Sequence, residues 1–424
     1  MSSRNKVFVL IVFLFQYCLY QNLSKAQEVD SLAVDSLNLR ENIVPEGDIR
    51  ETTVLLTGEE LINKDFPGSW PMFGTNMRMK LGGYVKADVL YDLNGTLDKK
   101  RFLMSTIPVE GQPEYDNSGY INFFTSETRF NIEVRRIEGT VPLRMYIETD
   151  FWTQGDMLRL RHAYVGAGNF IFGQTFSILH ISESKPYIID FGAGDAYYGG
   201  RTMQIRYQKR IKTNLQIVLG IEKLMNLGIE NPDTLKGFAS AQLPVFSARI
   251  DYSWEKGIIF LGAMLGQLRW DSQRNGKNPS AFQNNLVIAG RQYIGKNNYF
   301  TWNLSYGNGS GENIMSFVGS NANAVLTPEG KLQTMPAFSF LASYSHKWTD
   351  NLSSNFSYGY GWLETPPSRE PFSLKRGGVG HANIIWRPVR QFASGLEYMR
   401  GVQNTTNDAV GRAYRIQTMV RFDF

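Results

Sequence analysis

The most constraining feature of this sequence is the strict alternation of residues 411–424. From Arg412 onward the even-numbered positions are mostly apolar or aromatic, and the odd-numbered positions are mostly polar or charged. A β-strand sends alternate side chains to opposite faces, so this pattern predicts a strand with one apolar and one polar face. Chain termini usually fray, whereas the last strand of a closed barrel must pair with the first to leave no open edge in lipid. We therefore expect residues 411–424, ending on Phe424, to be the closing strand of an outer-membrane β-barrel.

The same two-residue rhythm recurs through most of the chain from Met77 onward. Segments of about ten residues match the length that a tilted membrane strand needs, and their number indicates about 16 strands. Short polar connectors alternate with long ones, which is typical of outer-membrane barrels. The predicted fold class is therefore all-β, a transmembrane antiparallel β-barrel over residues 71–424, with a soluble all-β protein as the alternative. The main alternating segments are 77–93, 123–135, 143–151, 157–165, 200–208, 212–223, 237–255, 257–270, 282–294, 300–306, 338–347, 352–362, 379–388 and 391–400. Five tryptophans near strand ends are expected to form interfacial girdles: Trp254, Trp270, Trp348, Trp362 and Trp386.

Only one long apolar run is present, and it lies in residues 1–26. A basic start is followed by the apolar stretch 7–15 and by Ser24-Lys25-Ala26, which predicts a secretory signal peptide. A single anchoring helix is the alternative. Cys18, the only cysteine, falls inside this run, so no disulfide framework is expected in the mature chain.

Residues 27–70 form a separate acidic stretch, expected to be a short periplasmic arm. They carry ten acidic and three basic residues, a net charge of 3 − 10 = −7, whereas the whole chain is +5. Residues at three- and four-residue spacing are compatible with a short oligomerising helix, but Pro45 ends that pattern after about two heptads. A solvated linker is the other interpretation.

Several motifs resemble those of the DcaP-like trimeric outer-membrane porins. They are GGYVKAD at 82–88, LRLRHAYV at 158–165 with GQTFS at 173–177, PYIIDF at 186–191 with RTMQIRY at 201–207, and the end of the chain. The similarity is densest over residues 77–210. It implies a barrel of about 16 strands, a homotrimer, and passive diffusion of small anions such as dicarboxylates across the outer membrane of a Gram-negative bacterium.

Arginines concentrate on the polar face of the early strands. If that face lines the lumen, neighbouring strands about 4.8 Å apart place guanidinium groups in a ladder, and such groups favour anions in a narrow pore. In the alternative, Glu133, Glu148 and Asp150 neutralise the ladder as structural ion pairs. The candidate pore-lining basic residues are Arg129, Arg135, Arg144, Arg159, Arg161 and Arg206.

Residues 178–200 form a long segment rich in glycine and aromatic residues between two basic strands. We expect it to be an inward-folded constriction loop, with Asp190 and Asp195 facing the arginines, and Arg201 following on the next strand. An ordinary surface loop and a latch between subunits are the alternatives.

No motif for catalysis, metal binding or cofactor binding stands out. The four histidines lack ligand spacing, and His162 shares the apolar parity of its strand, which favours a subunit-interface or interfacial position over a metal ligand. Basic residues alternate with apolar ones rather than clustering, so nucleic-acid binding has no support. The expected partners are small anionic solutes, outer-membrane lipid, further copies of the chain, and the barrel-assembly machinery through Phe424. A structural, adhesive or enzymatic barrel without open-pore transport is the alternative.

Overall fold

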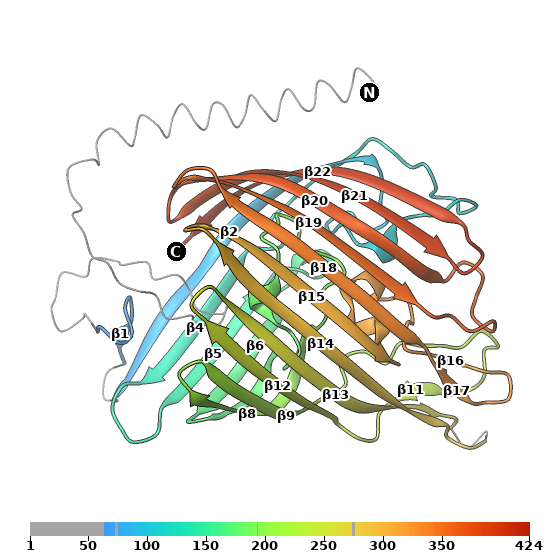
Figure 1. The fold of residues 1–424 in the computed structure, drawn as a ribbon, viewed down its shortest axis with the longest axis horizontal. Helices are drawn as coiled ribbons and strands as arrows, with labels where there is room; N and C mark the ends of the chain where they lie inside the picture. Colours follow the sequence, from blue (N-terminus) through green and yellow to red (C-terminus); the bar gives the residue numbers. More distant parts are fainter. Residues whose placement is uncertain (1–62, 73–74, 193, 274–275) are drawn as a thin grey trace.

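The chain is described by a computed structural model that covers residues 63–72, 75–192, 194–273 and 276–424. The predicted signal peptide and most of the predicted acidic arm lie outside these residues. Within them, sixteen antiparallel strands form a closed barrel (Figure 1). The barrel strands are β2 (Met77–Asn94), β4 (Arg129–Arg136), β5 (Leu143–Asp150), β6 (Arg159–Ala167), β7 (Phe170–Phe176), β8 (Arg201–Lys212), β9 (Leu215–Glu222), β12 (Val245–Trp254), β13 (Gly257–Asp271), β14 (Ser280–Ile294), β15 (Asn298–Asn308), β18 (Pro336–Lys347), β19 (Leu352–Leu363), β20 (Leu374–Val389), β21 (Phe392–Thr405) and β22 (Val410–Asp423). The short strands β1 (Trp70–Pro71), β3 (Tyr120–Phe124) and β11 (Phe238–Ser240) extend this sheet, while β10 (Ile229–Glu230), β16 (Ala324–Leu326) and β17 (Leu332–Thr334) form a small second sheet.

The barrel closes where β2 pairs with β22, as the alternation at the end of the chain predicts. The paired residues run from Tyr84 opposite Asp423 to Asn94 opposite Tyr414. Phe424 continues this pairing, because its backbone N–H and C=O both bond to Gly83. Closure satisfies backbone groups that would otherwise cost several kcal/mol each in lipid.

The apolar set of alternate side chains faces outward. Phe130, Phe356 and Phe422 are 44%, 52% and 52% exposed, and they lie on three different strands. The opposite faces of the same strands carry polar or small side chains that are buried or half-buried inside the barrel. The outer surface is thus the one that lipid tails cover, and the inner surface forms the lumen.

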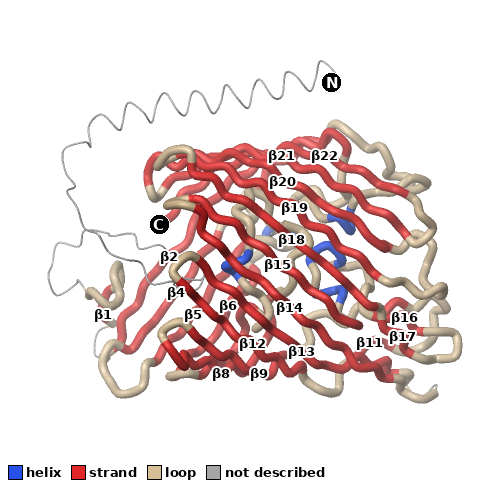
Figure 2. Tube along the Cα trace, in the orientation of Figure 1, coloured by secondary structure: helices blue, strands red, loops and turns tan. Residues whose placement is uncertain are grey.

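Short turns lie at one end of the barrel, and the long loops all lie at the other. Each of the seven turns is six residues or shorter, and the C-terminus lies at their end (Figure 1). Three of the long loops, residues 95–119, 177–200 and 309–335, fold back into the barrel. Their short 3-10 turns, such as η2 (Met104–Thr106) and η4 (Ser182–Ser184), lie within the barrel (Figure 2).

These three loops build an apolar core inside the barrel. Phe102, Ile178, Ile314 and Phe317 are each completely buried in it. The strand residues of this core come from β9, β12 to β14 and β18 to β22, and none of its described members comes from β4 to β8. One side of the lumen is therefore packed with apolar side chains, while the side formed by β4 to β8 is not.

An interruption between β3 and β4 changes the parity that alternation alone predicts. Residues 125–128 interrupt the pairing with β2, so that β3 and β4 are not one continuous strand. Phe123 is consequently 68% exposed, and Phe124, which the simple alternation predicts to be outward, is buried. The girdle prediction is also wrong for Trp270, which is buried and donates from its indole N–H to the backbone of Lys236.

Candidate permeation site

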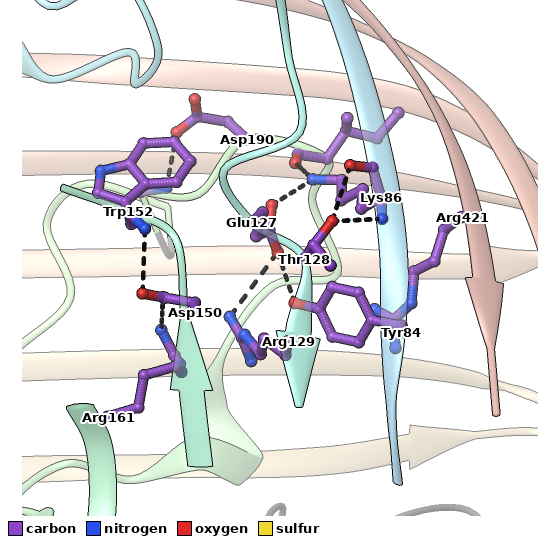
Figure 3. A network of polar contacts seen from close by, with 12 residues as sticks. Tyr84, Lys86, Glu127, Thr128, Arg129, Asp150, Trp152, Arg161, Asp190 and Arg421 are labelled. Atoms are coloured by element: carbon purple, nitrogen blue, oxygen red, sulfur yellow. Dashed lines mark hydrogen bonds and ion pairs between the residues drawn. The ribbon is translucent and has the colours of Figure 1, made fainter. Parts of the chain in front are cut away.

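The predicted arginine ladder lies on the lumen face of the strands β4, β5, β6 and β8. The outward positions between these arginines are apolar and exposed, including Phe130, Ile147 and Ile205. Because alternate side chains point to opposite faces, the arginines point inward. Figure 3 shows Arg129 and Arg161 projecting into the barrel with their acidic neighbours.

Four of the six predicted arginines are held in close ion pairs. Glu133 forms ion pairs with Arg135 and Arg144, with nitrogen–oxygen distances of 2.6 and 2.7 Å. Asp150 forms ion pairs with Arg159 and Arg161, both with a nitrogen–oxygen distance of 2.7 Å. The neutralising pairs considered as an alternative to a free ladder are therefore present in this part of the wall.

Glu148 adds a further carboxylate to the same group, because it pairs with Arg161 at 2.5 Å. Such pairs fix the guanidinium positions, since each side chain is oriented by more than one charge-assisted bond.

The remaining arginines are less closely paired with carboxylates. Arg129 lies 3.7 Å from Glu127, which is already bonded to Lys86. Arg206 donates to the side chain of Gln204 and to the carbonyl of Phe176. Arg201 has its guanidinium over the ring of Phe176 at 5.8 Å, and no carboxylate of the described residues pairs with it. A guanidinium without a carboxylate can bind an anion from solution.

The wall as a whole keeps an excess of positive charge. Seven arginines, the six of the ladder and Arg201, face four carboxylates, so the difference is 7 − 4 = +3. The four carboxylates are Glu127, Glu133, Glu148 and Asp150.

The segment predicted to fold inward, within residues 177–200, crosses the lumen and is anchored to the wall at both ends. We call residues 177–200 the inner loop. At its start, the backbone N–H of Ile178 donates to Glu222 on β9 at 2.9 Å, and Arg249 on β12 donates to the carbonyl of Ile178 at 2.7 Å. Near its middle, Arg291 on β14 donates to the carbonyl of Glu183 at 2.9 Å.

The tip of the inner loop is held by β2 and β21. Lys86 donates to the carbonyl of Ile189 at 2.7 Å, and the backbone N–H groups of Ile189 and Asp190 donate to Glu397 at 2.8 and 3.1 Å. These anchors fix the height of the loop in the barrel, so its distance from the arginine wall is set by the strands.

The two aspartates of the inner loop bond to another loop. Asp190 accepts from the backbone N–H of Phe102 at 3.0 Å, and Asp195 accepts from that of Met104 at 2.9 Å. Both carboxylates are buried, which raises the pKa of Asp190 and raises the pKa of Asp195 to about 7. The structure thus places both side chains at the junction with residues 95–119, and the two aspartates hold these loops together.

The inner-loop residue that does reach the arginine wall is aromatic. The ring of Phe191 stacks on Trp152 with centroids 4.1 Å apart, and the guanidiniums of Arg129, Arg159 and Arg161 lie 5.6–5.9 Å from its centroid. Cations over an aromatic face are attracted by about 0.5–2 kcal/mol. Phe191 therefore narrows the lumen at the charged wall.

A β-bulge in β6 places His162 on the opposite face of the barrel wall from the one that simple alternation predicts. Glu148 pairs with His162 and Thr149 with Leu160, which leaves Arg161 as the extra residue. A bulge shifts the parity of the strand beyond it. His162 is consequently buried on the lumen side and shares a 2.9 Å hydrogen bond with Thr175, rather than lying at the membrane interface.

Several lumen-facing cations were not singled out from the sequence. Arg421 lies over the ring of Tyr84 at 3.7 Å, and Arg387 donates to the hydroxyl of Tyr187 in the inner loop at 2.9 Å. Each occupies the polar parity of its strand, so the same alternation could have identified it. They include Lys86, Arg249, Arg291, Arg387 and Arg421.

Neither metal binding nor helical membrane spanning is indicated within the described ranges. No three His, Cys, Asp or Glu side chains there come together as metal ligands do. No helix in the same ranges is long and apolar enough to cross a membrane.

Comparisons with known proteins agree on the fold. The model of the family described as "DcaP outer membrane protein" matches residues 31–424. The crystal structure of the outer membrane channel DcaP of Acinetobacter baumannii is similar with a TM-score of 0.73 and 18% identity, over 84% of this chain and all of that chain. An anion-selective porin from Comamonas acidovorans has a TM-score of 0.55 at 10% identity, over 82% of this chain and all of that chain.

The trimer form of OmpT of Vibrio cholerae gives a TM-score of 0.52 at 11% identity, over 82% of this chain and 99% of that chain. A search of curated protein sequences finds no match.

Proposed function

The chain belongs to the DcaP outer membrane protein family, and from this premise we propose that it carries small anions across the membrane by passive diffusion. Its family and fold are those of a channel in the outer membrane of a Gram-negative bacterium. The observation that supports anion preference is the excess of seven arginines over four carboxylates on the lumen wall. Rings of positive side chains in a narrow pore favour anions.

The wall suits carboxylates in particular. A guanidinium offers parallel N–H donors that match the two oxygens of a carboxylate. Arg201 and Arg206 form no ion pair with a carboxylate of the described residues, and Arg129 is paired only with Glu127 at 3.7 Å. We propose dicarboxylates as the solute class, because two separated carboxylates can bind two guanidiniums in succession along the wall.

The proposed site residues are Arg129, Arg135, Arg144, Arg159, Arg161 and Arg206, together with the inner loop that carries Asp190 and Asp195 and leads to Arg201. The proposed working form is a homotrimer. The proposed domain organisation is a signal peptide at 1–26, an acidic arm at 27–70 and the barrel at 71–424.

Reversal potentials test this function. The purified protein in planar bilayers, under a tenfold KCl gradient, is expected to show a reversal potential of the sign for chloride preference. Added dicarboxylate is expected to reduce the chloride current more than a monocarboxylate of similar size. A potential of the opposite sign, or no conductance, would contradict the proposal.

A further inference from the structure

Three arginines lie on the outer surface of the barrel, toward the long-loop end of β20, β21 and β22. Arg376, Arg400 and Arg412 are all exposed, and each belongs to a different one of these strands. Since β20 pairs with β21 and β21 pairs with β22, the three residues share one part of the wall (Figure 1). We call these three residues the outer arginine patch.

The alternation of the strands shows that the patch faces away from the lumen. Each arginine has the parity of an exposed apolar or aromatic residue of its own strand, namely Ile384, Tyr398 and Phe422. Neighbours of the opposite parity, such as Met399 and Ala413, are completely buried inside the barrel. The patch therefore lies on the surface that faces lipid, and not on the wall that a solute meets.

The patch lies at the edge of the lipid-facing band. Arg376 and Arg412 are each the third residue of a strand from its long-loop end, and Arg400 is the sixth from that end of β21. A lipid-facing arginine is strongly unfavourable at the bilayer midplane but nearly neutral at the interface, so the patch must lie at headgroup level. Long loops of outer-membrane barrels are extracellular, which places the patch in the outer leaflet.

Aromatic side chains mark the same level. Tyr398 and Tyr414 share the outward parity of Arg400 and Arg412, and tyrosines of this kind gather where acyl chains meet headgroups. The guanidinium of Arg400 lies over the ring of Tyr414 at 5.8 Å, which helps to hold it at the surface.

No acidic side chain neutralises the patch. The outward positions of β20, β21 and β22 are the even-numbered ones, and they include no aspartate or glutamate. Among the residues that the structure describes, no carboxylate forms an ion pair with any of the three arginines. Asp408, in the turn between β21 and β22, pairs with Lys375 at 3.8 Å. The patch thus offers a charge of +3 to a ligand.

Two of the guanidiniums are close neighbours. Arg412 lies opposite Val402, and Arg400 lies opposite Tyr414. Arg400 and Arg412 are therefore diagonal neighbours on adjacent strands, about 7–8 Å apart. Two guanidiniums at this spacing can donate to the oxygens of one phosphate group.

The third guanidinium stands apart from these two. Arg376 lies two strands from Arg412, about 10 Å across the sheet. Gly378 follows it on the outward face of β20 and has no side chain, and Tyr358 of β19 packs there with its hydroxyl. A ligand that carries two separated phosphates can therefore contact Arg376 with one of them and the other two arginines with the second.

We propose that the outer arginine patch binds the phosphate groups of a bisphosphorylated lipid in the outer leaflet. The guanidiniums hold the phosphates at headgroup level, while Leu396 and Ile416, nearer the middle of their strands on the same face, contact the acyl chains. This inference goes beyond the proposed function, because it concerns the lipid-facing surface and does not depend on which solute crosses the pore.

The test titrates the full chain, purified in detergent, with bisphosphorylated lipid A and counts the bound lipid by native mass spectrometry. The patch variant combines Arg376→Gln, Arg400→Gln and Arg412→Gln. The matched control combines Lys209→Gln, Arg210→Gln and Lys212→Gln, which removes three exposed positive charges from the short-turn end of β8. Heat-modified gel mobility verifies that each barrel is folded.

The patch variant is expected to bind lipid A about a hundredfold more weakly than the wild type, from about fivefold for each guanidinium. The control should bind like the wild type. Lipid A from which both phosphates have been removed should bind the wild type as weakly as intact lipid A binds the patch variant. Inorganic phosphate in large excess should leave the lipid bound, because it lacks the acyl chains.

Equal binding of lipid A by the patch variant and the wild type overturns the inference, and so does an equal loss in the control. Displacement of the lipid by inorganic phosphate would mean that the patch is a site for free anions, which also overturns it. A change in the oligomeric mass of the patch variant, without a change in lipid binding, would assign this surface to contact between copies of the chain instead.

Discussion

The two sides of the lumen differ in how much of their wall is covered by loops. Along β4 to β8 the wall carries charges that are paired, oriented and partly accessible, and one aromatic ring from the inner loop reaches it. Along β9 to β22 the wall combines apolar and small side chains with charged groups that hold the inner loop, such as Arg249 and Glu397, and three loops fill the space with completely buried residues such as Phe317. The packed side holds the inner loop in place, and the charged side supplies the chemistry that a solute meets.

The largest effect is expected on the packed side. Phe317→Ala removes a fully buried ring and leaves a cavity, which should lower the free energy of unfolding by about 3–5 kcal/mol. Urea unfolding in detergent micelles measures this loss. Anion preference should change little, since Phe317 makes no contact with the arginine wall. If Phe317→Ala shifted selectivity as much as an arginine substitution does, the assignment of stability to one side and of selectivity to the other would be wrong.

The next effect belongs to the charged side. Arg201→Glu combined with Arg206→Glu changes the wall charge by four, from +3 to −1, and should shift the permeability ratio toward cations about tenfold, equivalent to about 1.4 kcal/mol. Reversal potentials report the change. The matched control, Lys236→Glu with Lys331→Glu, makes the same charge change in the loops 223–244 and 309–335. An equal shift in the control would show that overall charge, rather than the wall, sets selectivity.

A smaller effect sharpens the role of the ion pairs. Glu133→Gln removes the carboxylate shared by Arg135 and Arg144, and should raise anion preference about twofold at 0.1 M salt. Reversal potentials at 0.1 and 1 M KCl measure it. A decrease in anion preference would mean that the pair positions the arginines more than it neutralises them.

The smallest effect concerns pH at the loop junction. Burial raises the pKa of Asp195 to about 7, above its ordinary value of 3.8. Between these two values the unfolded chain loses the proton while the folded protein keeps it, so the wild-type stability falls as pH rises from about 4 to 7.

Asp195→Asn removes this dependence, and the variant should gain a few degrees in melting temperature relative to wild type between pH 4 and pH 8. Parallel melting curves measure the difference, because all other titrating groups are shared. A constant offset across the pH range would contradict this account.

Alternation along the sequence predicts the fold well, because an outer face against lipid and an inner face against water impose the same rhythm on every strand. Residues such as Phe130 and Arg129 could be assigned to faces from this rhythm alone. It fails where one residue is added or a strand is interrupted, as at His162 and Phe124. Bulges depend on the register between two strands, which no single strand encodes.

The candidate site was predicted only in part for a related reason. The polar face identifies Arg135, but it does not show that Glu133 on the same strand also reaches Arg144 on the next. The partners of Asp190 and Asp195 lie in a loop about ninety residues away, with sequence separations of 88 and 91. Contacts between loops depend on the completed barrel, so local pattern carries no signal for them.

The seam between β2 and β22 also bears on how the protein is made. Gln417 donates to Asp88 at 2.8 Å across 329 residues of chain, so this edge of β2 has no partner until β22 has been made. The barrel therefore cannot close before β22 has been made. Until then the backbone N–H and C=O groups on this edge of β2 are unpaired and could bond to another chain. Biogenesis of this protein therefore requires a holding step before insertion, and the slowest event should be the meeting of its two outermost strands.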